Sequence, residues 1–520
     1  MDEEELYGTY EVSTTICNRF GALLVEKGYR SEGELEEFFA VREQFEAIVS
    51  RLQSAEAAIL EHGDIEATVH QDGTELLRRL VQAHLDWRAN QEVRRSEIIG
   101  ADDIERTHVR VDCERKLTTL FGDVTVRRLA YSARGSTSLF PLDCELNLPD
   151  DQYSHGLSEQ ANRDVANQAF DNVVAEMKRK PGGQIPKRQL EAMTIKASHD
   201  FEAFYAGNEA ACSAPGNLLI LSVDGKGIVM REEGLREATR KAARQECHKL
   251  KTRLSPGEKR NRKRMATVAT VYSIKPNVRT PESIMETESP GTDPPRPKPE
   301  NKRVWASVER EPRTVIEEQF AEALRRDPEK RCQWVMLVDG QEHQLALIRK
   351  CMKRYDVEPI LVLDFIHVLE YVWKAAYCFH DAGSEEAEQW VRERALRILQ
   401  GKASDVAAGM RRSATLREMG ANERIGVDKC ADYLIDYPGM LHYNEFLAAG
   451  LPIATGVIEG ACRHLIKDRM DITGARWSLR GAEAILKLRS LRSSGDFDDY
   501  WAFHKLKSYE RNHESRYVNL

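Results

Sequence analysis

The chain lacks several patterns that define common protein classes. Its ten cysteines are scattered without a C-x-x-C pair, which argues against a zinc ribbon or a disulfide framework. No apolar run approaches the ~20 residues that cross a bilayer, and the acidic start MDEEELYGTY has no signal-peptide core. There is also no Gly-rich phosphate loop, no Ser nucleophile elbow and no H-E-x-x-H motif. These absences predict a cytoplasmic protein with no membrane partner, and they make an enzyme of small metabolites a remote alternative.

The bulk composition is that of a folded globular protein with several domains. A chain of 520 residues has room for about three or four domains of ~150 residues each. Hydrophobic residues make up 41% and charged residues 31% of the chain, as in ordinary soluble domains. The net charge of −8 counts against nucleic-acid binding over the whole chain, so clusters of basic residues must decide that question locally.

Helical periodicity dominates the N-terminal 210 residues. Residues 1–106 predict packing or oligomerisation helices. Residues 107–150 predict a short β-hairpin around Gly122-Asp123, followed by a Pro-broken loop, LFPLDCELNLP. Residues 151–210 predict one helix, ANRDVANQAFDNVVAEMKRK, then a break at Pro181-Gly182-Gly183 and a second helix, KRQLEAMTIKASHDFEAFY. This outline is typical of a DNA-binding helix-turn-helix, and an ordinary helical hairpin is an equal alternative.

The C-terminal 300 residues predict an α/β core interrupted by helices. Residues 216–364 begin with two apolar strands, LLILSVDGKGIVM and MATVATVYSI, which flank a basic loop at 236–264. A Pro-rich loop at 275–303 follows, and then strand–helix–strand units that favour parallel pairing. Residues 365–450 are predicted to be an all-helical insertion. Residues 451–505 are predicted to be two core helices with an aromatic tail.

Three acidic residues of this core are candidate metal ligands. Asp224 and Asp339 each end an apolar run, in LILSVDG and VMLVDG, and Glu459 lies in the helical stretch GVIEGACRHLIKDRM. Carboxylates at the tips of buried strands point into a cleft, and Mg²⁺ binds through such oxygens. Two ions roughly 4 Å apart can stabilise both oxygens of a phosphoryl displacement. Asp-Gly is also a common turn pair, so ordinary loops are the competing interpretation.

The order of these elements indicates a fold class. A first Asp strand leads a hairpin, a second Asp strand begins a strand–helix–strand unit, and a helical block separates it from a helical Glu. The spacings are 115 residues from Asp224 to Asp339 and 120 residues from Asp339 to Glu459. This is the order of a ribonuclease-H-like fold with an all-helical insertion. Competing carboxylates are Glu342, Asp468, Asp471 and Glu483.

Several of these segments together carry a family resemblance. They are SVDGKG, VMLVDGQ, LDFIHVLEYVW and the C-terminal IEGACRHLIKDRMDITGARWSLRGAEAILKLRSLRSSGDFDDYW. Over roughly residues 70–505 the chain resembles bacterial insertion-sequence transposases of the DDE type, the ISKra-type family, with mutator-like transposases as more distant relatives. The resemblance implies DNA transposition with Mg²⁺ or Mn²⁺, by a cut-and-paste or a copy-out route, and recognition of terminal inverted repeats.

The resemblance also assigns residues. It implies that Asp224, Asp339 and Glu459 are the catalytic, metal-binding triad. Asp364 and His367, in D-x-x-H, would be an accessory pair, although many relatives have Cys where Asp364 stands. Related chains often carry Cys pairs in the N-terminal half, which this chain lacks.

Basic residues near these carboxylates are candidate DNA contacts. Residues 236–264 contain twelve Lys or Arg against three Glu, and phosphate contact supplies most sequence-independent DNA affinity. A solvated loop or helix face is the alternative for each charged residue, and core packing is the alternative for the tryptophan. The candidates are Lys226, Lys187, Arg188, Lys259, Arg260, Arg262, Lys263, Arg264, Arg463, Lys467, Arg469 and Trp477.

The sequence therefore predicts a nucleoid-associated DDE transposase that cleaves and joins double-stranded DNA as a homo-oligomer. Two alternatives stay open. One is a catalytically silent, transposase-derived DNA-binding protein, which would not need three intact carboxylates. The other is a ribonuclease-H-like nuclease or resolvase, although stand-alone nucleases of this fold are usually shorter.

Overall fold

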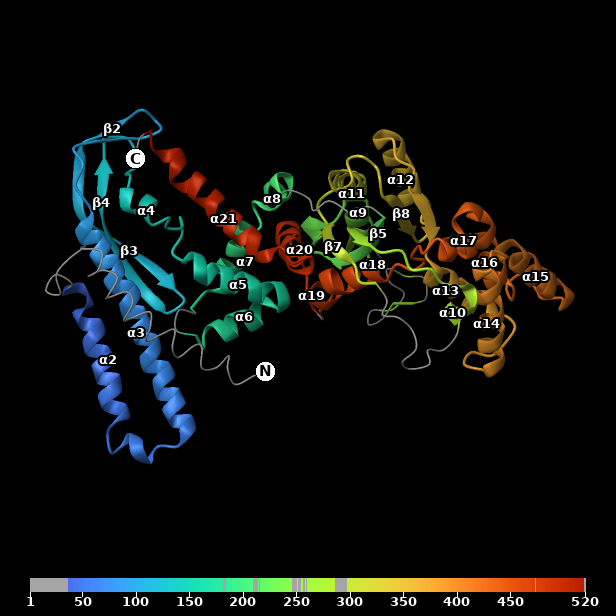
Figure 1. Cartoon of the computed structure of the whole chain (residues 1–520), viewed down its shortest axis with the longest axis horizontal. Helices are drawn as coiled ribbons and strands as arrows, with labels where there is room; N and C mark the ends of the chain where they lie inside the picture. The colour runs from blue at the N-terminus through green and yellow to red at the C-terminus, as the bar shows by residue number, and fades with distance from the viewer. Residues whose placement is uncertain are drawn as a thin grey trace. The chain divides into compact units, whose positions relative to one another are not determined.

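The computed structural model describes residues 36–180, 184–208, 214, 216–245, 250, 254–255, 258, 260–285, 297–472 and 474–518. The chain forms two compact units and has a mixed α/β fold (Figure 1). The first unit comprises 1–161, 171–187 and 505–520, and the second comprises 162–170 and 188–504. No helix in the described ranges is long and apolar enough to span a membrane.

The first unit contains a long β-hairpin and a helical pair. Strands β3 (His108–Thr119) and β4 (Gly122–Ser132) pair antiparallel along their length, so the hairpin is longer than the predicted short one. The outer half of β3 carries polar residues on both faces, which hides its strand periodicity. The predicted Pro-broken loop contains α4 (Pro141–Glu145), because proline is well suited to the first helical position. The remaining elements are α2 (Phe39–Leu52), α3 (His62–Gln91), β1 (Ile98–Ile99) and β2 (Glu105–Arg106), with 3₁₀ turns at Glu36–Phe38, Ala57–Ile59 and Glu514–Arg516.

Helix α3 covers the hairpin with an apolar face. Leu85 of α3 packs against Val124 and Val126 of β4 and against Leu117 of β3. These side chains are at most 6% exposed, and they form a small core of their own.

Two predicted helices are each broken into two, and short polar side chains lie at both breaks. The first becomes α5 (His155–Asn167) and α6 (Phe170–Met177), and the amide of Asn167 donates to the carbonyl of Arg163 at 3.0 Å. The second becomes α7 (Lys187–Ala197) and α8 (Phe201–Gly207), where the Ser198 hydroxyl donates to the Ile195 carbonyl at 2.9 Å. Such side chains compete with the backbone for hydrogen bonds and end helices.

A five-stranded mixed sheet forms the centre of the second unit. Its strand order is β7-β6-β5-β8-β9. Strands β5, β6 and β7 are antiparallel neighbours, whereas β5, β8 and β9 run parallel. The predicted hairpin and the predicted strand–helix–strand unit are therefore confirmed. The strands are β5 (Leu218–Val229), β6 (Lys263–Ile274), β7 (Glu300–Ser307), β8 (Gln333–Val338) and β9 (Ile360–Leu363).

Helices pack against this sheet, and α13 to α17 make up the predicted helical block of residues 365–450. Helix α11 packs on β5 and β6, and α20 packs against β7 (Figure 1). Part of the predicted basic loop is the helix α9. The other helices are α9 (Glu237–Arg244), α10 (Pro281–Met285), α11 (Pro312–Arg326), α12 (Glu342–Tyr355), α13 (Phe365–Ala376), α14 (Glu385–Leu399), α15 (Ala403–Leu416), α16 (Ile425–Asp436), α17 (Tyr443–Ala448), α18 (Gly456–Ala461), α19 (Asp468–Met470), α20 (Leu479–Ser494) and α21 (Phe497–Asn512), with 3₁₀ turns at Glu232–Gly234 and Pro438–Met440.

The helical run that carries Glu459 is not a regular α-helix. Between α18 and α19, residues Cys462–Lys467 form a π-helix. A π-helical turn is rare and is frequently found at functional sites. It also changes which side chains face the sheet beyond that point.

Candidate active site

Three aspartates lie at one edge of the sheet. The parallel pairing of β5 with β8 ends at Ser222↔Leu337, and that of β8 with β9 ends at Val338↔Leu363. Asp224, Asp339 and Asp364 follow these positions within two residues. The carboxyl ends of parallel strands meet at the same edge, where α/β proteins bind ligands.

Asp224 is held inside strand β5 and not at its tip. The strand continues to Val229 because β6 pairs with it beyond Asp224, which itself pairs with Val268. The side chain is half-buried. Its Oδ1 accepts from the Gly225 amide at 2.5 Å, and its Oδ2 accepts from the Cys462 thiol at 3.1 Å. Both side-chain oxygens of Asp224 therefore accept a hydrogen bond.

Asp339 directly follows β8 in a turn fastened by two tyrosines. Its Oδ1 accepts from the Gln341 amide at 2.9 Å. The hydroxyl of Tyr433 donates to the Asp339 carbonyl at 2.8 Å, and that of Tyr437 donates to the Gly340 carbonyl at 2.6 Å. Gly340 has φ +85°, and a Cβ there would lie 3.1 Å from the Tyr433 ring. Helix α16 of the helical block thus fixes the turn after β8.

The buried Asp364 and the half-buried His367 form a pair at the start of α13. Asp364 is 0% exposed and caps the helix by accepting from the Ile366 amide at 3.0 Å. Its Oδ2 accepts from His367 Nδ1 at 2.9 Å and from the Thr455 hydroxyl. The hydrogen bond to Asp364 raises the pKa of His367 to about 9, against the opposing effect of burial. His367 is therefore a cation at neutral pH.

Glu459 brings a fourth carboxylate to this edge from helix α18. It is exposed, and single ligand atoms of Glu459, Asp364 and His367 lie within 4.8 Å of one another. Partial burial and the charges of Asp364 and Asp224 raise the pKa of Glu459, whereas His367 lowers it. The charge of Asp339 contributes to the raised pKa of His367. All five predicted catalytic and accessory residues therefore belong to one electrostatic cluster.

The residues whose ligand atoms lie closest together are not those of the predicted triad. The close group is Asp364, His367 and Glu459, and Asp224 and Asp339 do not belong to it. Asp364 already has three hydrogen-bond donors, and a cation that binds His367 would have to displace its proton. Asp224 accepts two hydrogen bonds and Asp339 accepts one. Both are half-buried and Glu459 is exposed, so these three are better suited to a hard divalent cation than the buried Asp364.

Some predicted DNA contacts lie exposed near the cluster. Lys226 is exposed two residues after Asp224, on the same face of β5. Arg463 and Lys467 are exposed on the π-helix. Arg463 Nε lies 3.7 Å from Asp468, so its charge is partly compensated.

The remaining basic candidates occupy two separate segments. Arg260, Arg262 and Lys263 are exposed before and at the start of β6, and Lys263 Nζ lies 3.9 Å from Asp471. Lys259 lies outside the described residues. Lys187 and Arg188 are exposed at the start of α7; the Lys187 ammonium binds Asp171 at 2.8 Å. The predicted break at 181–183 also lies outside the described residues, and the helix-turn-helix stays a prediction.

The side chains of three residues predicted to contact DNA bind other groups of the protein. Arg469 is 2% and Trp477 is 7% exposed, and the two side chains stack with 4.9 Å between guanidinium carbon and ring centre. The Trp477 ring nitrogen donates to the Met470 carbonyl at 3.1 Å. Arg264 donates to the carbonyls of Val308, Gly234 and Glu309. Burial of Arg469 and Trp477 contradicts their predicted contact with DNA.

The sequence analysis missed Cys462, Tyr433, Tyr437 and Thr455. Cys462 stands three residues after Glu459, one helical turn away, which is the only signal that could have indicated it. The competing carboxylate Glu483 is 4% exposed and accepts from the Val308 and Glu309 amides, so it has a structural role.

Comparison of the chain with family models and with curated proteins finds no match. The interpretation of the site therefore depends on its geometry and on the resemblance noted in the sequence.

Proposed function

We propose that the chain is an enzyme of metal-dependent phosphoryl transfer on nucleic acid. The observation that carries this proposal is that Asp224, Asp339 and Asp364 follow the ends of the parallel pairing at one sheet edge, where the charges of Asp364 and Asp224 act on Glu459 from a distant helix. The charges of Asp364 and Asp224 contribute to raising the pKa of Glu459, and a bound cation would remove that repulsion. Phosphoryl displacement requires this kind of acidic, cation-binding site.

Within that class, the particular function we propose is that of a DDE transposase. The sheet order supports the proposal, since an antiparallel three-strand meander followed by two parallel strands is the arrangement expected for a ribonuclease-H-like core. The helical block between Asp364 and Glu459 matches the predicted insertion. Double-stranded DNA is the proposed substrate, with a nucleoid-associated location.

Residues of the chain would have separate tasks in this reaction. Asp224, Asp339 and Glu459 would hold Mg²⁺ or Mn²⁺, which when bound supplies Lewis acidity to the phosphodiester. His367 would keep a positive charge near the scissile phosphate, because its pKa of about 9 leaves it protonated. Asp364 would position His367 by its hydrogen bond. Lys226, Arg463 and Lys467 would contact the DNA backbone.

The test is metal-dependent cleavage and strand transfer on labelled DNA that carries the ends of the chain's own element. Wild type is compared with Asp224→Asn and with Asp468→Asn, an exposed control on the same helical run as Glu459. Cleavage that needs Mg²⁺ or Mn²⁺ and is lost only in Asp224→Asn supports the proposal. Specific end binding without cleavage would favour the silent DNA-binding alternative. Cleavage of any duplex or junction without preference for the ends would favour the nuclease alternative.

Oligomerisation is a separate part of the proposal. Two DNA ends must be held together, and the N-terminal helices are the proposed contact. Helix α2 and the turn after it expose Phe39, Phe45 and Ile59, which are 63%, 48% and 85% exposed. Such apolar side chains are suited to burial against a second copy of the chain.

A further inference from the structure

A basic cavity lies in the second unit, away from the candidate active site. Its volume is about 240 Å³, and its lining includes Lys302 and Arg303 of β7, Arg325 and Arg326 of α11 and the acidic Glu322. On strand β6, Asp224 pairs with Val268 and Arg303 pairs with Val271. Arg303 is therefore displaced by three residues along β6, away from the sheet edge that carries the aspartates. The cavity is therefore a different place from the carboxylate cluster.

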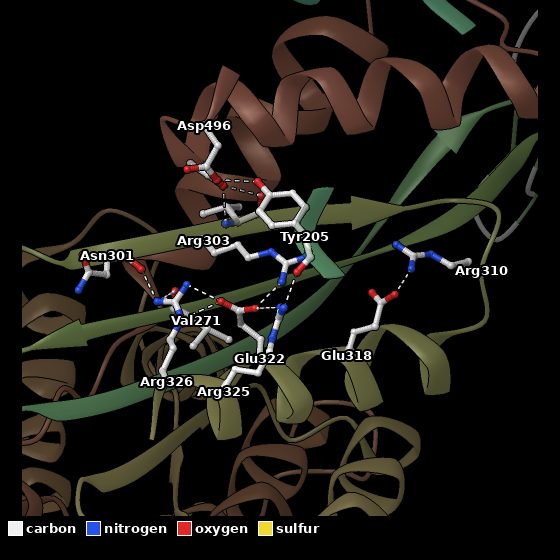
Figure 2. Close-up of polar contacts among 12 residues, drawn as sticks. Tyr205, Val271, Asn301, Arg303, Arg310, Glu318, Glu322, Arg325, Arg326 and Asp496 are labelled. Atoms are coloured by element: carbon white, nitrogen blue, oxygen red, sulfur yellow. Dashed lines mark hydrogen bonds and ion pairs between the residues drawn. The ribbon is translucent and has the colours of Figure 1, made fainter. Parts of the chain in front are cut away.

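One carboxylate serves three guanidinium groups in this cavity. Glu322 accepts from Arg303 Nη1 at 2.5 Å, from Arg326 Nε at 2.8 Å and from Arg325 (Figure 2). The side chains of Glu322, Arg326 and Arg303 are only 4%, 6% and 9% exposed. Burial would raise the pKa of Glu322, but the three arginine charges outweigh it and lower that pKa to about 2.

The second acidic group of the cavity is engaged elsewhere. Asp496 accepts from the Tyr205 hydroxyl at 2.6 Å. The Tyr205 ring in turn covers the guanidinium of Arg303 at 3.7 Å, so the aromatic face shields Arg303 from water. Four basic and two acidic side chains line the cavity, which leaves an excess of positive charge.

Arg303 also has hydrogen-bonding capacity that the protein does not use. Its Nε is buried and has no hydrogen-bond partner among the described residues. A buried donor without a partner is costly unless a ligand supplies the missing hydrogen bond. Binding of an anion that accepts from Arg303 Nε would remove this cost.

We propose that the basic cavity binds a phosphate group. A phosphate dianion would balance the excess of basic over acidic side chains, and its oxygens match the planar fork of arginine. The volume is below the ~300 Å³ at which pockets begin to enclose drug-sized ligands. We therefore expect the cavity to enclose a phosphate group and not the rest of a larger phosphorylated ligand. The group comes either from a small phosphorylated molecule or from the DNA backbone.

The test compares matched arginine variants of the full chain. Arg325→Gln removes a cavity guanidinium that is 35% exposed, and Arg313→Gln removes one from the same helix that is 69% exposed and binds Glu317. Inorganic phosphate is titrated while the midpoint of thermal unfolding is followed, with sodium chloride at equal ionic strength as reference. Phosphate should stabilise wild type and Arg313→Gln. Arg325→Gln should bind phosphate at least about tenfold more weakly, since hydrogen bonds to charged groups are strong.

Two outcomes would overturn the proposal. One is a phosphate response no larger than that of chloride, and the other is an equal response in all three proteins. If Arg325→Gln folds poorly, Lys302→Gln replaces it, because Lys302 is exposed and lines the same cavity.

Binding of a labelled DNA duplex to the same variants identifies the source of the phosphate. Equal weakening of phosphate and DNA binding in Arg325→Gln assigns the cavity to the DNA backbone. Weakened phosphate binding with unchanged DNA binding assigns it to a small phosphorylated ligand. Neither arm requires cleavage, so the proposed activity can fail while this proposal stands.

Discussion

Replacement of Glu322 by glutamine should destabilise the second unit strongly. The three arginines lower the pKa of Glu322 from 4.5 to about 2, and each pKa unit corresponds to about 1.36 kcal/mol. The ionised carboxylate therefore contributes on the order of 3 kcal/mol. This agrees with the ~3–5 kcal/mol typical for removing one partner of a buried ion pair. The amide keeps the shape of the side chain but removes the charge that the arginines share.

The matched control for this variant is Glu318→Gln. Glu318 lies one turn earlier on α11 and is paired with Arg310 (Figure 2). Its side chain is 34% exposed. A partly exposed pair of this kind contributes up to about 1 kcal/mol. Urea unfolding of both variants and of wild type, followed by circular dichroism, gives the free energies of unfolding. A loss below about 1 kcal/mol in Glu322→Gln, or equal losses in the two variants, would refute the reasoning.

The same carboxylate predicts how stability depends on pH. Its folded pKa lies below the unfolded value of 4.5, so its stabilising effect is present above pH 4.5. That effect is lost as the pH falls from 4.5 toward about 2, because the unfolded chain binds the proton first. Wild type should lose more stability than Glu322→Gln over this range, measured by urea unfolding at each pH. Parallel pH curves for the two proteins would contradict the assignment.

Four further outcomes follow from the structure. Tyr433→Phe should lower the rate of DNA cleavage more than the affinity for substrate. It should also cost about 1 kcal/mol of stability through the lost hydrogen bond to the Asp339 carbonyl. An unchanged cleavage rate would exclude a positioning role for Tyr433. Trp477→Ala should cost about 3–5 kcal/mol in urea unfolding while the folded protein keeps its DNA affinity. Lys226→Gln should weaken binding of labelled duplex and reduce its salt dependence without changing the thermal midpoint. Deletion of residues 1–60 should reduce the mass measured by light scattering, and an unchanged mass would contradict the oligomerisation proposal.

The fold could be predicted from the sequence wherever periodicity was strong. The apolar runs of β5, β6, β8 and β9 have the length and boundaries of buried strands, and all four are present. The breaks after Asn167 and Ser198 were missed. Each depends on a single short side chain that bonds to a carbonyl of the preceding turn, which a search for apolar spacing does not detect.

The candidate site was predictable in part, for a different reason. Asp224, Asp339 and Asp364 stand in or directly after recognisable strands, so the sequence indicates a shared edge. Tyr433 and Cys462 come from segments 94 and 238 positions from their partners, and only the folded chain brings them together.

The burial of Arg469 was not predicted because the preceding turn is a π-helix, whereas Trp477 lies beyond this helical run and takes the core-packing alternative. A period of 3.6 residues predicts the wrong face beyond such a turn. The phase of the helix therefore cannot be carried from Glu459 to Arg469 by counting.

The long separation in sequence between Asp224 and the helix of Glu459 has a consequence for synthesis on the ribosome. All five strands of the central sheet are complete at Leu363, whereas α18 begins at Gly456. A nonsense codon anywhere in the helical block would therefore yield a product with every strand and all three edge aspartates, but without the last carboxylate. Such a product would also lack α20, which packs against β7, so the sheet would lose part of its helical cover together with Glu459.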